Sequence, residues 1–335
     1  MNKLHKVGLT ALATSLVASS AFAGDLSVSG GAAISYTGKS SNSGANPWAM
    51  GNSVKFNGSG ELDNGTTFSA YWELDNDIMD DYNISFGMPN DMGTVKFCVS
   101  ECGNNKKYAW DQSAYTSMSD TGYSEGIVYP DDMGSYASIQ YHTPELPFGI
   151  TGSVAHGNPK KDGQSGNTTA TGGNSATEFS LTIAPIDGLT LTGSFMEQNL
   201  YTDGTVNNGQ KEQNGAYAIT YAVGNLTAGY GKSYKAPEML EANRAATVVE
   251  YYENTGYSIG YAVNDDLSVS YTREESAANQ STSSNTIYDV ELDSVQLAYS
   301  LGGATLSIAR MDVENVGYAQ NVDLAETIIA MTFAF

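Results

Sequence analysis

Apolar residues and small or polar residues alternate with a period of two along most of the chain. In one typical stretch, Phe68, Trp72 and Leu74 alternate with Ser69 and Glu73. Because successive side chains of a β-strand point to opposite faces, this pattern predicts strands with one apolar and one polar face. The same period recurs in the segments 54–62, 82–88, 95–99, 179–183, 189–195, 217–223, 257–263, 267–271 and 295–301.

The last residues of the chain continue this pattern. Ile329, Met331, Phe333 and Phe335 share one face of the predicted strand, and the other face carries Glu326 with mostly small residues. Chain ends usually fray. An aromatic residue at the end of the chain therefore predicts a last strand that is held in a sheet up to residue 335.

The connections between the predicted strands are of two alternating kinds. Seven are short turns rich in Gly, Asn, Asp and Pro, and eight are long and polar. A soluble β-sandwich would show the same two-residue period, but it has no reason to sort its connections. Sixteen strands with short turns on one rim and long loops on the other are typical of an outer-membrane β-barrel. The turns are 63–65, 89–93, 144–149, 185–188, 223–225, 264–266 and 301–303, and the loops are 37–50, 76–81, 100–133, 157–174, 202–213, 235–246, 274–286 and 314–322.

The predicted fold class is therefore all-β, a 16-stranded antiparallel transmembrane β-barrel with short periplasmic turns and long external loops. A barrel of about 16 strands is too wide for side chains to fill and encloses water. The small, polar face is expected to line that water, with Ser194, Thr220 and Ser270 among its residues, and the apolar face to meet lipid. Since backbone groups in lipid have no water to bind, the last strand has to pair with the first, residues 26–36.

The first 23 residues have the form of a secretory signal peptide. Lys3 and Lys6 precede an apolar stretch over 7–17, and Ala21 and Ala23 give the small-x-small form of a cleavage site. The apolar run is shorter than the roughly 20 residues of a membrane-spanning helix. We therefore divide the chain into a signal peptide, residues 1–23, and a single barrel domain, residues 24–335.

Charge excludes one class of partner and the residue pattern excludes most enzymes. Without the signal peptide, 13 basic residues stand against 37 acidic ones. Nucleic acid is not expected as a partner, because phosphate binding needs clustered Lys and Arg. His142 and His156 occur without a Gly-x-Ser-x-Gly elbow or a recognisable catalytic partner, so no enzyme is predicted.

Three segments make the chain resemble a known family. They are the end Ile-Ile-Ala-Met-Thr-Phe-Ala-Phe (328–335), the start Leu-Ser-Val-Ser-Gly-Gly-Ala-Ala-Ile-Ser-Tyr (26–36), and 138–154 with its Tyr-x-Thr-Pro-x-x-x-x-Gly core. With the layout of the strands, they resemble the Gram-negative general diffusion porins of the alpha- and betaproteobacterial type. The resemblance implies an outer-membrane homotrimer in contact with lipids and lipopolysaccharide, and a loop after the fifth strand that folds inward. It also implies that Phe335 is similar to the signal that the barrel-assembly machinery reads.

The longest predicted connection, residues 100–133 and here called the third loop, is the candidate constriction. Long ordered loops are usually functional, and this one carries six acidic residues against Lys106 and Lys107. If it folds into the lumen as the resemblance implies, a ring of carboxylates would favour cations. The alternative is that individual acids face solvent or pair locally. The acidic residues are Glu101, Asp111, Asp120, Glu125, Asp131 and Asp132.

The wall opposite the third loop carries a cluster of Arg and Lys in typical members of the resembled family. Here the alternation places Lys55 and Lys96 on the inner face together with Glu61 and Glu73, and Gln140 stands where relatives often have a basic residue. The basic wall is thus depleted. We expect the pore to prefer cations.

Cys98 and Cys102 are the only cysteines. In an exported protein a disulfide is the default, and this one would close a small ring at the base of the third loop. Two free thiols are the alternative. A metal site is disfavoured, because no further soft ligand lies nearby in the sequence.

An acidic cluster before the fourth strand raises the question of calcium. Asp75, Asp77, Asp80 and Asp81 offer hard oxygen ligands at short spacing, but the Gly and the twelfth-position Glu of an EF-hand loop are missing. We interpret the cluster as a solvated loop that faces lipopolysaccharide with bridging divalent cations. A Ca²⁺ site in the loop is the alternative, and no other cofactor is predicted.

The sequence thus predicts a water-filled channel for the passive diffusion of small hydrophilic solutes and ions. Three alternatives stay open: a porin specific for one nutrient, a structural envelope barrel, and a secreted β-rich adhesin without channel activity. The adhesin would not need a terminal aromatic residue. The structural barrel would need a plugged lumen, whereas the expected inner residues are small.

Overall fold

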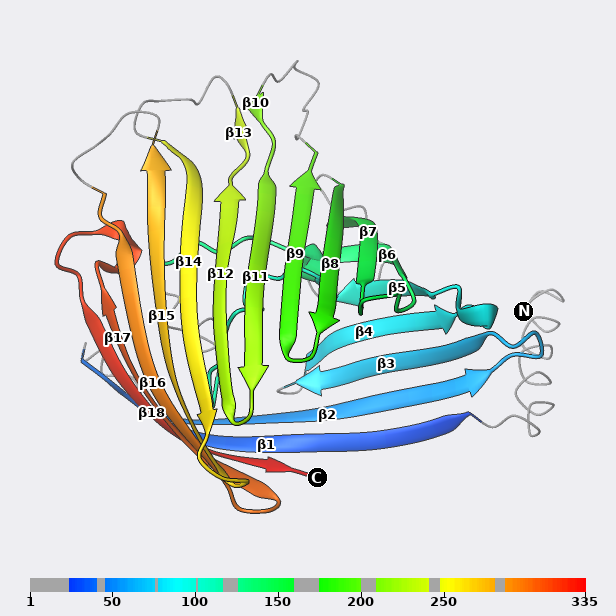
Figure 1. The fold of residues 1–335 in the computed structure, drawn as a ribbon, viewed down its shortest axis with the longest axis horizontal. Coiled ribbons are helices and arrows are strands. Elements are labelled where there is room, and N and C mark those ends of the chain that lie inside the picture. Colours follow the sequence, from blue (N-terminus) through cyan, green and yellow to red (C-terminus); the bar gives the residue numbers. More distant parts are fainter. Residues whose placement is uncertain are drawn as a thin grey trace, which may run out of the picture.

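The computed structural model describes residues 24–40, 46–75, 78–100, 102–116, 126–159, 175–199, 209–240, 248–280 and 287–335. Over these ranges, sixteen antiparallel strands form one closed barrel in which each strand pairs with its neighbours in chain order (Figure 1). Two further short strands pair with each other outside the barrel. The predicted fold class is confirmed. The predicted signal peptide lies outside the described residues.

The barrel strands are of 7 to 15 residues. They are β1 (Asp25–Lys39), β2 (Trp48–Glu61), β3 (Thr67–Asp75), β4 (Ile78–Gly87), β5 (Thr94–Ser100), β6 (Tyr136–His142), β7 (Thr151–Pro159), β8 (Ala176–Ile186), β9 (Leu189–Gln198), β11 (Gln213–Val223), β12 (Leu226–Ala236), β14 (Val249–Ala262), β15 (Leu267–Gln280), β16 (Val290–Ser300), β17 (Ala304–Glu314) and β18 (Leu324–Ala334). The two strands outside the barrel are β10 (Gly209–Gln210) and β13 (Met239–Leu240), and single 3₁₀ turns are η1 (Pro89–Asp91), η2 (Met133–Ser135) and η4 (Val316–Tyr318).

Within the described ranges, the seven predicted turns all join consecutive strands, from β2–β3 to β16–β17. Two predicted loops are shorter than expected. β4 already begins at Ile78, and β15 continues to Gln280 although the loop was expected from Glu274. In β15 the polar residues Glu274 and Ser276 are buried on the inner face, where they contact other parts of the chain, so polarity there does not mark a loop.

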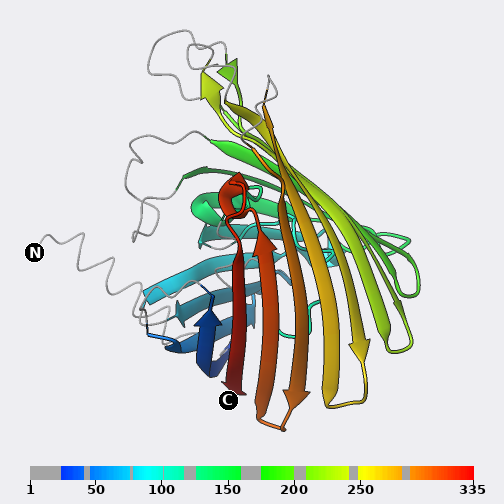
Figure 2. The ribbon, with the colours of Figure 1, turned by 90° about the vertical axis from the view of Figure 1, so that its left-hand side faces the viewer.

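Pairing of the first strand with the last closes the barrel. β1 is hydrogen-bonded to β2 on one side and to β18 on the other, from Gly31 opposite Ala334 to Lys39 opposite Glu326. Gly30 and Phe335 exchange two backbone hydrogen bonds of 2.7 and 3.0 Å. The two strands lie side by side in Figure 2. The predicted last strand is therefore held in the sheet up to the end of the chain.

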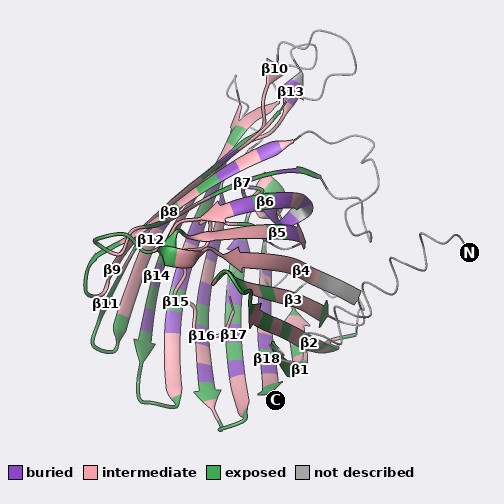
Figure 3. Cartoon of the chain, turned by 90° about the vertical axis from the view of Figure 1, so that its right-hand side faces the viewer, coloured by how far each residue is buried: buried purple, intermediate pink, exposed green. Residues whose placement is uncertain are grey.

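The two faces of the strands differ as the alternation predicts. Large apolar side chains such as Phe179, Ile219 and Val295 are exposed on the outside, which is the face that meets lipid in a membrane barrel. Buried positions alternate with exposed ones along β14 to β18 (Figure 3). No helix in the described part of the chain is long and apolar enough to cross a membrane.

The neighbouring residues Ile219 and Thr220 test this assignment of faces. Ile219 points outward and pairs with Leu191 and Tyr230, whereas Thr220 points inward. An Arg on the lipid face of a barrel costs about 2–4 kcal/mol at mid-membrane depth. We expect Ile219→Arg to lower the free energy of unfolding in lipid vesicles by about this amount, and the matched Thr220→Arg to change it by less than about 1 kcal/mol. Equal losses in the two variants would contradict the assignment.

Candidate functional site

The base of the third loop is fixed at the inner wall of the barrel. Cys98 and Cys102 form the predicted disulfide, with Cα atoms 6.2 Å apart. The side-chain Nε2 of Gln140 in β6 donates to the carbonyl of Cys102 at 2.8 Å, and the Asn104 N–H donates to Oε2 of Glu178 in β8 at 2.9 Å. The loop therefore leaves the wall in a defined direction.

Residues 102–116, here called the first arm, cross the inner face of the barrel from β8 to β16. Backbone N–H groups of the arm donate to polar side chains of successive strands, since a loop away from water needs partners for its backbone. These bonds run from Lys106 to Ser194 Oγ (2.9 Å), Gln112 to Ser258 Oγ (2.8 Å), Ala114 to Ser270 Oγ (2.8 Å), and Tyr115 and Thr116 to Gln296 Oε1 (3.0 Å each).

This arrangement corrects one expectation. Ser194 and Ser270 were expected to line water, but their hydroxyls accept hydrogen bonds from the third loop. Ser270 is only 6% exposed. On this side of the barrel, the small polar residues hold the loop against the wall.

Residues 126–132, here called the second arm, return over β14 to β17. Ile127 packs into a hydrophobic cluster on the inner face of β16 to β18. Tyr129 donates its hydroxyl proton to Glu274 Oε2 at 2.7 Å. Burial and the charge of Glu274 raise the pKa of Tyr129 well above its usual value, so the phenol stays a donor. The cluster consists of Ile127, Val290, Leu292, Ala309, Met311, Val313, Leu324, Ile328 and Ala330.

The connection between β17 and β18 also takes part in this cluster. Val316 and Tyr318 in η4 pack against it, and the Tyr318 hydroxyl accepts from the N–H of Val128 at 3.2 Å. The expectation of a polar, water-lined inner face is thus wrong for the loop-side ends of β16 to β18. Two loops cover this part of the wall and exclude water from it.

The acidic residues of the third loop that the structure describes make contacts within the loop or with the barrel wall. Asp111 accepts hydrogen bonds from the backbone and the hydroxyl of Ser113, at 2.9 and 2.6 Å. Asp132 pairs with Lys107 at 3.3 Å, and Asp131 pairs with Lys235 of β12 at 2.8 Å. Glu101, Asp120 and Glu125 lie outside the described residues.

Asp131 belongs to a carboxyl pair that fastens the second arm to β11. Its N–H donates to Asn214 Oδ1 at 2.9 Å, and Asn214 in turn donates to Glu212 at 3.0 Å. Burial and the hydrogen bond to Asp131 raise the pKa of Glu212. Burial alone would raise the pKa of Asp131, but the hydrogen bond from Glu212 and the Lys235 ammonium outweigh it and lower that pKa. At pH values between these two pKa values, Glu212 donates to ionised Asp131, and the Lys235 ammonium lies 3.8 Å from Glu212.

The wall that the third loop leaves uncovered belongs to β1 to β5. Lys55 pairs with Glu73 at 3.3 Å, and the Tyr71 hydroxyl donates to the same carboxylate at 2.6 Å. Lys96 lies on β5 directly opposite Gln140 of β6. Gln140 itself is buried under the first arm. The positive charge of Lys55 is thus compensated across the strand pair.

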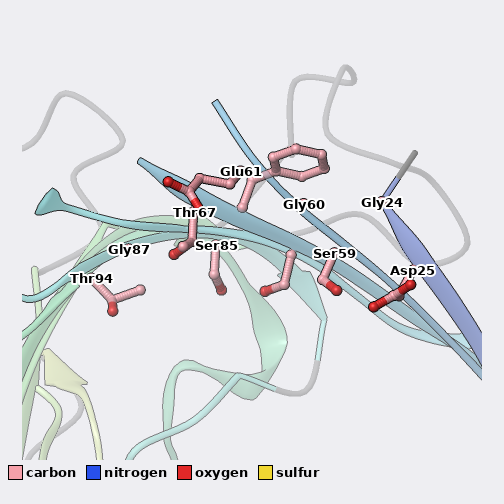
Figure 4. Close-up of a pocket in the computed structure, with 11 residues that line it drawn as sticks. Gly24, Asp25, Ser59, Gly60, Glu61, Thr67, Ser85, Gly87 and Thr94 are labelled. Carbon is pink, nitrogen blue, oxygen red and sulfur yellow. The ribbon is translucent and has the colours of Figure 1, made fainter. Parts of the chain in front are cut away.

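At the turn side of β1 to β5, the inner wall forms a cavity of about 530 Å³. Asp25 and Glu61 contribute carboxylates, and the other polar side chains that line it are hydroxyls. Asp25, Ser59 and Ser85 project from the same side of the strands (Figure 4). The lining residues are Gly24, Asp25, Ser59, Gly60, Glu61, Thr67, Phe68, Ser69, Ser85, Gly87 and Thr94.

The predicted calcium cluster is described only in part. Asp75 ends β3 and Asp81 lies in β4, while Asp77 and the side chain of Asp80 fall outside the described residues. Among the described residues, no three His, Cys, Asp or Glu side chains are grouped so that they could hold a metal ion.

Several residues that position the third loop were missed by sequence reasoning. Gln296 and Glu274 were not singled out, and neither was Trp110, which is 2% exposed beneath the loop. One signal in the sequence indicates that the third loop covers this wall. Leu292, Met311 and Val313 fall on the polar face of their strands by alternation, and apolar residues on a water-lining face indicate that something covers them.

A closed barrel with an apolar outer face and a loop across its interior defines the class of outer-membrane β-barrel channels. The sequence matches the family model described as Gram-negative porin over residues 8–309. The chain belongs to this family. It is therefore an integral outer-membrane channel of a Gram-negative bacterium and not an enzyme.

Solved porin structures share the fold at low sequence identity. An anion-selective porin from Comamonas acidovorans is 11% identical with a TM-score of 0.67, and the match covers 93% of this chain and 100% of that one. Salmonella typhi OmpF in complex with daunomycin is 12% identical with a TM-score of 0.68, covering 93% and 98%. A porin refined at 1.8 Å resolution is 14% identical with a TM-score of 0.65, covering 93% and 100%. No curated protein matches the chain significantly.

The carboxyl pair predicts a pH window for the second arm. The raised pKa of Glu212 gives stability that is present at low pH and lost as the pH rises through that pKa. The lowered pKa of Asp131 gives stability that is lost as the pH falls through it. The contact between Glu212 and Asp131 is therefore strongest at pH values between their two pKa values. We expect the hydrogen-exchange protection factors of residues 126–132 to be highest in this window.

Glu212→Gln separates the loss of protection at high pH from the loss at low pH, because the amide keeps a donor for Asp131 and cannot ionise. In this variant the loss of protection on the alkaline side should disappear and the loss on the acidic side should remain. If the wild-type protein and Glu212→Gln lose protection equally as the pH rises, the proton shared by Glu212 and Asp131 does not hold the second arm.

Proposed function

We propose that this porin is a passive diffusion channel that prefers cations over anions. Small hydrophilic solutes and ions pass through the water between the third loop and the wall of β1 to β5. No cofactor and no conformational cycle are needed, because the solute moves down its own gradient. Size exclusion comes from the third loop, and charge preference comes from carboxylates that face the open lumen.

Ion pairs inside the barrel compensate most of the lysines that could favour anions. Lys39 pairs with Glu326 at 3.4 Å, in addition to the pairs that Lys55, Lys107 and Lys235 make. Each pair is close to neutral at the distance of a passing ion.

Two further lysines, Lys96 and Lys106, lie near the lumen. Asp81 lies close enough to Lys96 for their charges to interact. Lys106 forms no ion pair with a residue that the structure describes. The positive charges of Lys96 and Lys106 limit how strongly the pore prefers cations.

The observation that carries the proposal is the cavity at the turn side of β1 to β5. Asp25 and Glu61 line it, and none of the described residues that line it is a Lys or an Arg. A concave wall with charges of one sign raises the local concentration of the opposite ion. The selectivity of the Comamonas porin shows that this fold also serves anions, so the sign has to come from the residues of each chain.

We also propose how the protein is exported and assembled in the outer membrane. Residues 1–23 would be removed as a signal peptide, leaving residues 24–335 as the barrel domain. The barrel-assembly machinery would read the terminal Phe335. Membership of a family whose barrels are typically trimeric supports a homotrimer embedded among outer-membrane lipids and lipopolysaccharide.

The reversal potential in a potassium chloride gradient tests the charge preference. Two unit charges about 7 Å apart in water interact by about 0.6 kcal/mol, roughly a threefold change in local ion concentration. We expect a wild-type potential toward the potassium equilibrium value. Asp25→Asn with Glu61→Gln should lower the potassium-to-chloride permeability ratio by about twofold or more at low salt.

Glu314→Gln is the control for the removal of one carboxylate charge, because Glu314 is exposed at the loop end of β17, and it should leave the ratio unchanged. A wild-type preference for chloride would refute the cation preference. A ratio that responds equally to Glu314→Gln would show that the cavity carboxylates do not set it.

A further inference from the structure

Four glycines on the inner face of β12 and β14 form a depression beneath the first arm. Gly229 and Gly231 come from β12, and Gly256 and Gly260 from β14. Gly231 lies directly opposite Gly256 across the strand pair. Glycine weakens a strand interior and often marks a place where another backbone approaches closely. We call these four residues the glycine notch.

Trp110 fills the glycine notch. A Cβ atom on Gly256 would overlap the indole ring, and one on Gly231 would lie 2.5 Å from the indole Cδ1. A Cβ on Gly229 would overlap the carbonyl oxygen of Trp110. A Cβ on Gly260 would lie 2.7 Å from the Oγ1 of Thr227 in β12 and 2.8 Å from the carbonyl oxygen of Gln112. No side chain larger than hydrogen fits these four positions while the loop stays in place.

Hydrogen bonds hold the Trp110 indole and the chain on both sides of this residue. Its indole Nε1 donates to the carbonyl of Lys107 at 2.9 Å, which leaves no polar atom of the ring without a partner. The neighbouring N–H groups of Lys106 and Gln112 donate to Ser194 and Ser258. The indole is thus held flat against the wall between two anchors.

We propose that the glycine notch sets the width of the pore, with Trp110 as the positioning residue that docks the third loop. This inference rests on the proposed function as a diffusion channel. Ordinary contacts between carbon atoms are about 3.5–4.0 Å, so a single methyl group at Gly231 would push the arm about 1 Å into the lumen. The loop acts as a fixed part of the wall, and the depth of the notch decides how much lumen it leaves.

Gly256→Ala and Gly229→Ala test the notch. Both should lower the single-channel conductance and slow the permeation of the largest admitted sugar into liposomes by about twofold or more relative to the smallest, since a narrower constriction discriminates more by size. Gly193→Ala is the control for a glycine-to-alanine change in a barrel strand. It places a methyl group on the outer face of β9, which β11 separates from β12, 3.7 Å from the nearest atom, which is ordinary contact, and should change neither quantity.

Each glycine variant is combined with Trp110→Ala. The double variants show whether the loss of conductance comes from displacement of Trp110 or from a general defect of the barrel. The three atoms nearest to a Cβ on Gly256 all belong to the indole, so Trp110→Ala should rescue Gly256→Ala. The clash at Gly229 is with backbone atoms of residue 110, so the same change should fail to rescue Gly229→Ala. This pattern of coupling is what a double-mutant cycle detects.

The heat-modifiable mobility of the barrel on gels shows whether each variant assembles. If Gly229→Ala does not assemble, the cycle of Gly256 with Trp110 decides alone, because Trp110→Ala adds no atoms. Unchanged conductance and sugar discrimination in Gly256→Ala, or an additive double variant, would overturn the proposal. A wild-type protein that inserts without conducting would refute the proposed function instead.

Discussion

Every other feature depends on the requirement that backbone polar groups in lipid find partners within the protein. The pairing of β1 with β18 meets it, and it continues to the exchange between Gly30 and Phe335. Closure also fixes the register of every strand. A slip of one residue would turn each inner side chain to the lipid, so the hydroxyls under the third loop and the carboxylates of the open wall hold their places because the barrel closes in one register.

The same rule governs the third loop, which has no strand partner of its own. Its first arm donates backbone hydrogen bonds to Ser194, Ser258 and Gln296 on the wall. The inner face of the barrel thus serves two purposes. From β8 to β16 its polar groups satisfy a loop, and from β1 to β5 they face the lumen. The pore is therefore asymmetric, with one wall buried beneath protein and one wall open to water.

Much of this architecture could be predicted because it is local in the sequence. The alternation, the turns and the Cys98 and Cys102 disulfide need only neighbouring residues. The docking of Trp110 could not be predicted, since it joins a loop residue to glycines more than a hundred positions away. The end of β15 was misjudged because Glu274 reads as a loop residue, although it accepts a hydrogen bond from Tyr129. Loop-to-wall contacts leave no periodic signal.

The location of charge matters more for selectivity than its sum. The formal net charge of the chain is −22, yet Glu178 and Glu274 are each 1% exposed and face no water. Glu73 and Glu326 are bound to lysines. Exposed charges are screened within about 8 Å at physiological ionic strength, so carboxylates on the outer rim act weakly on an ion in the lumen. In the proposed channel, the field that a passing ion meets would come from a few carboxylates on the open wall, and the residues that line the cavity there include Asp25 and Glu61 but no Lys or Arg.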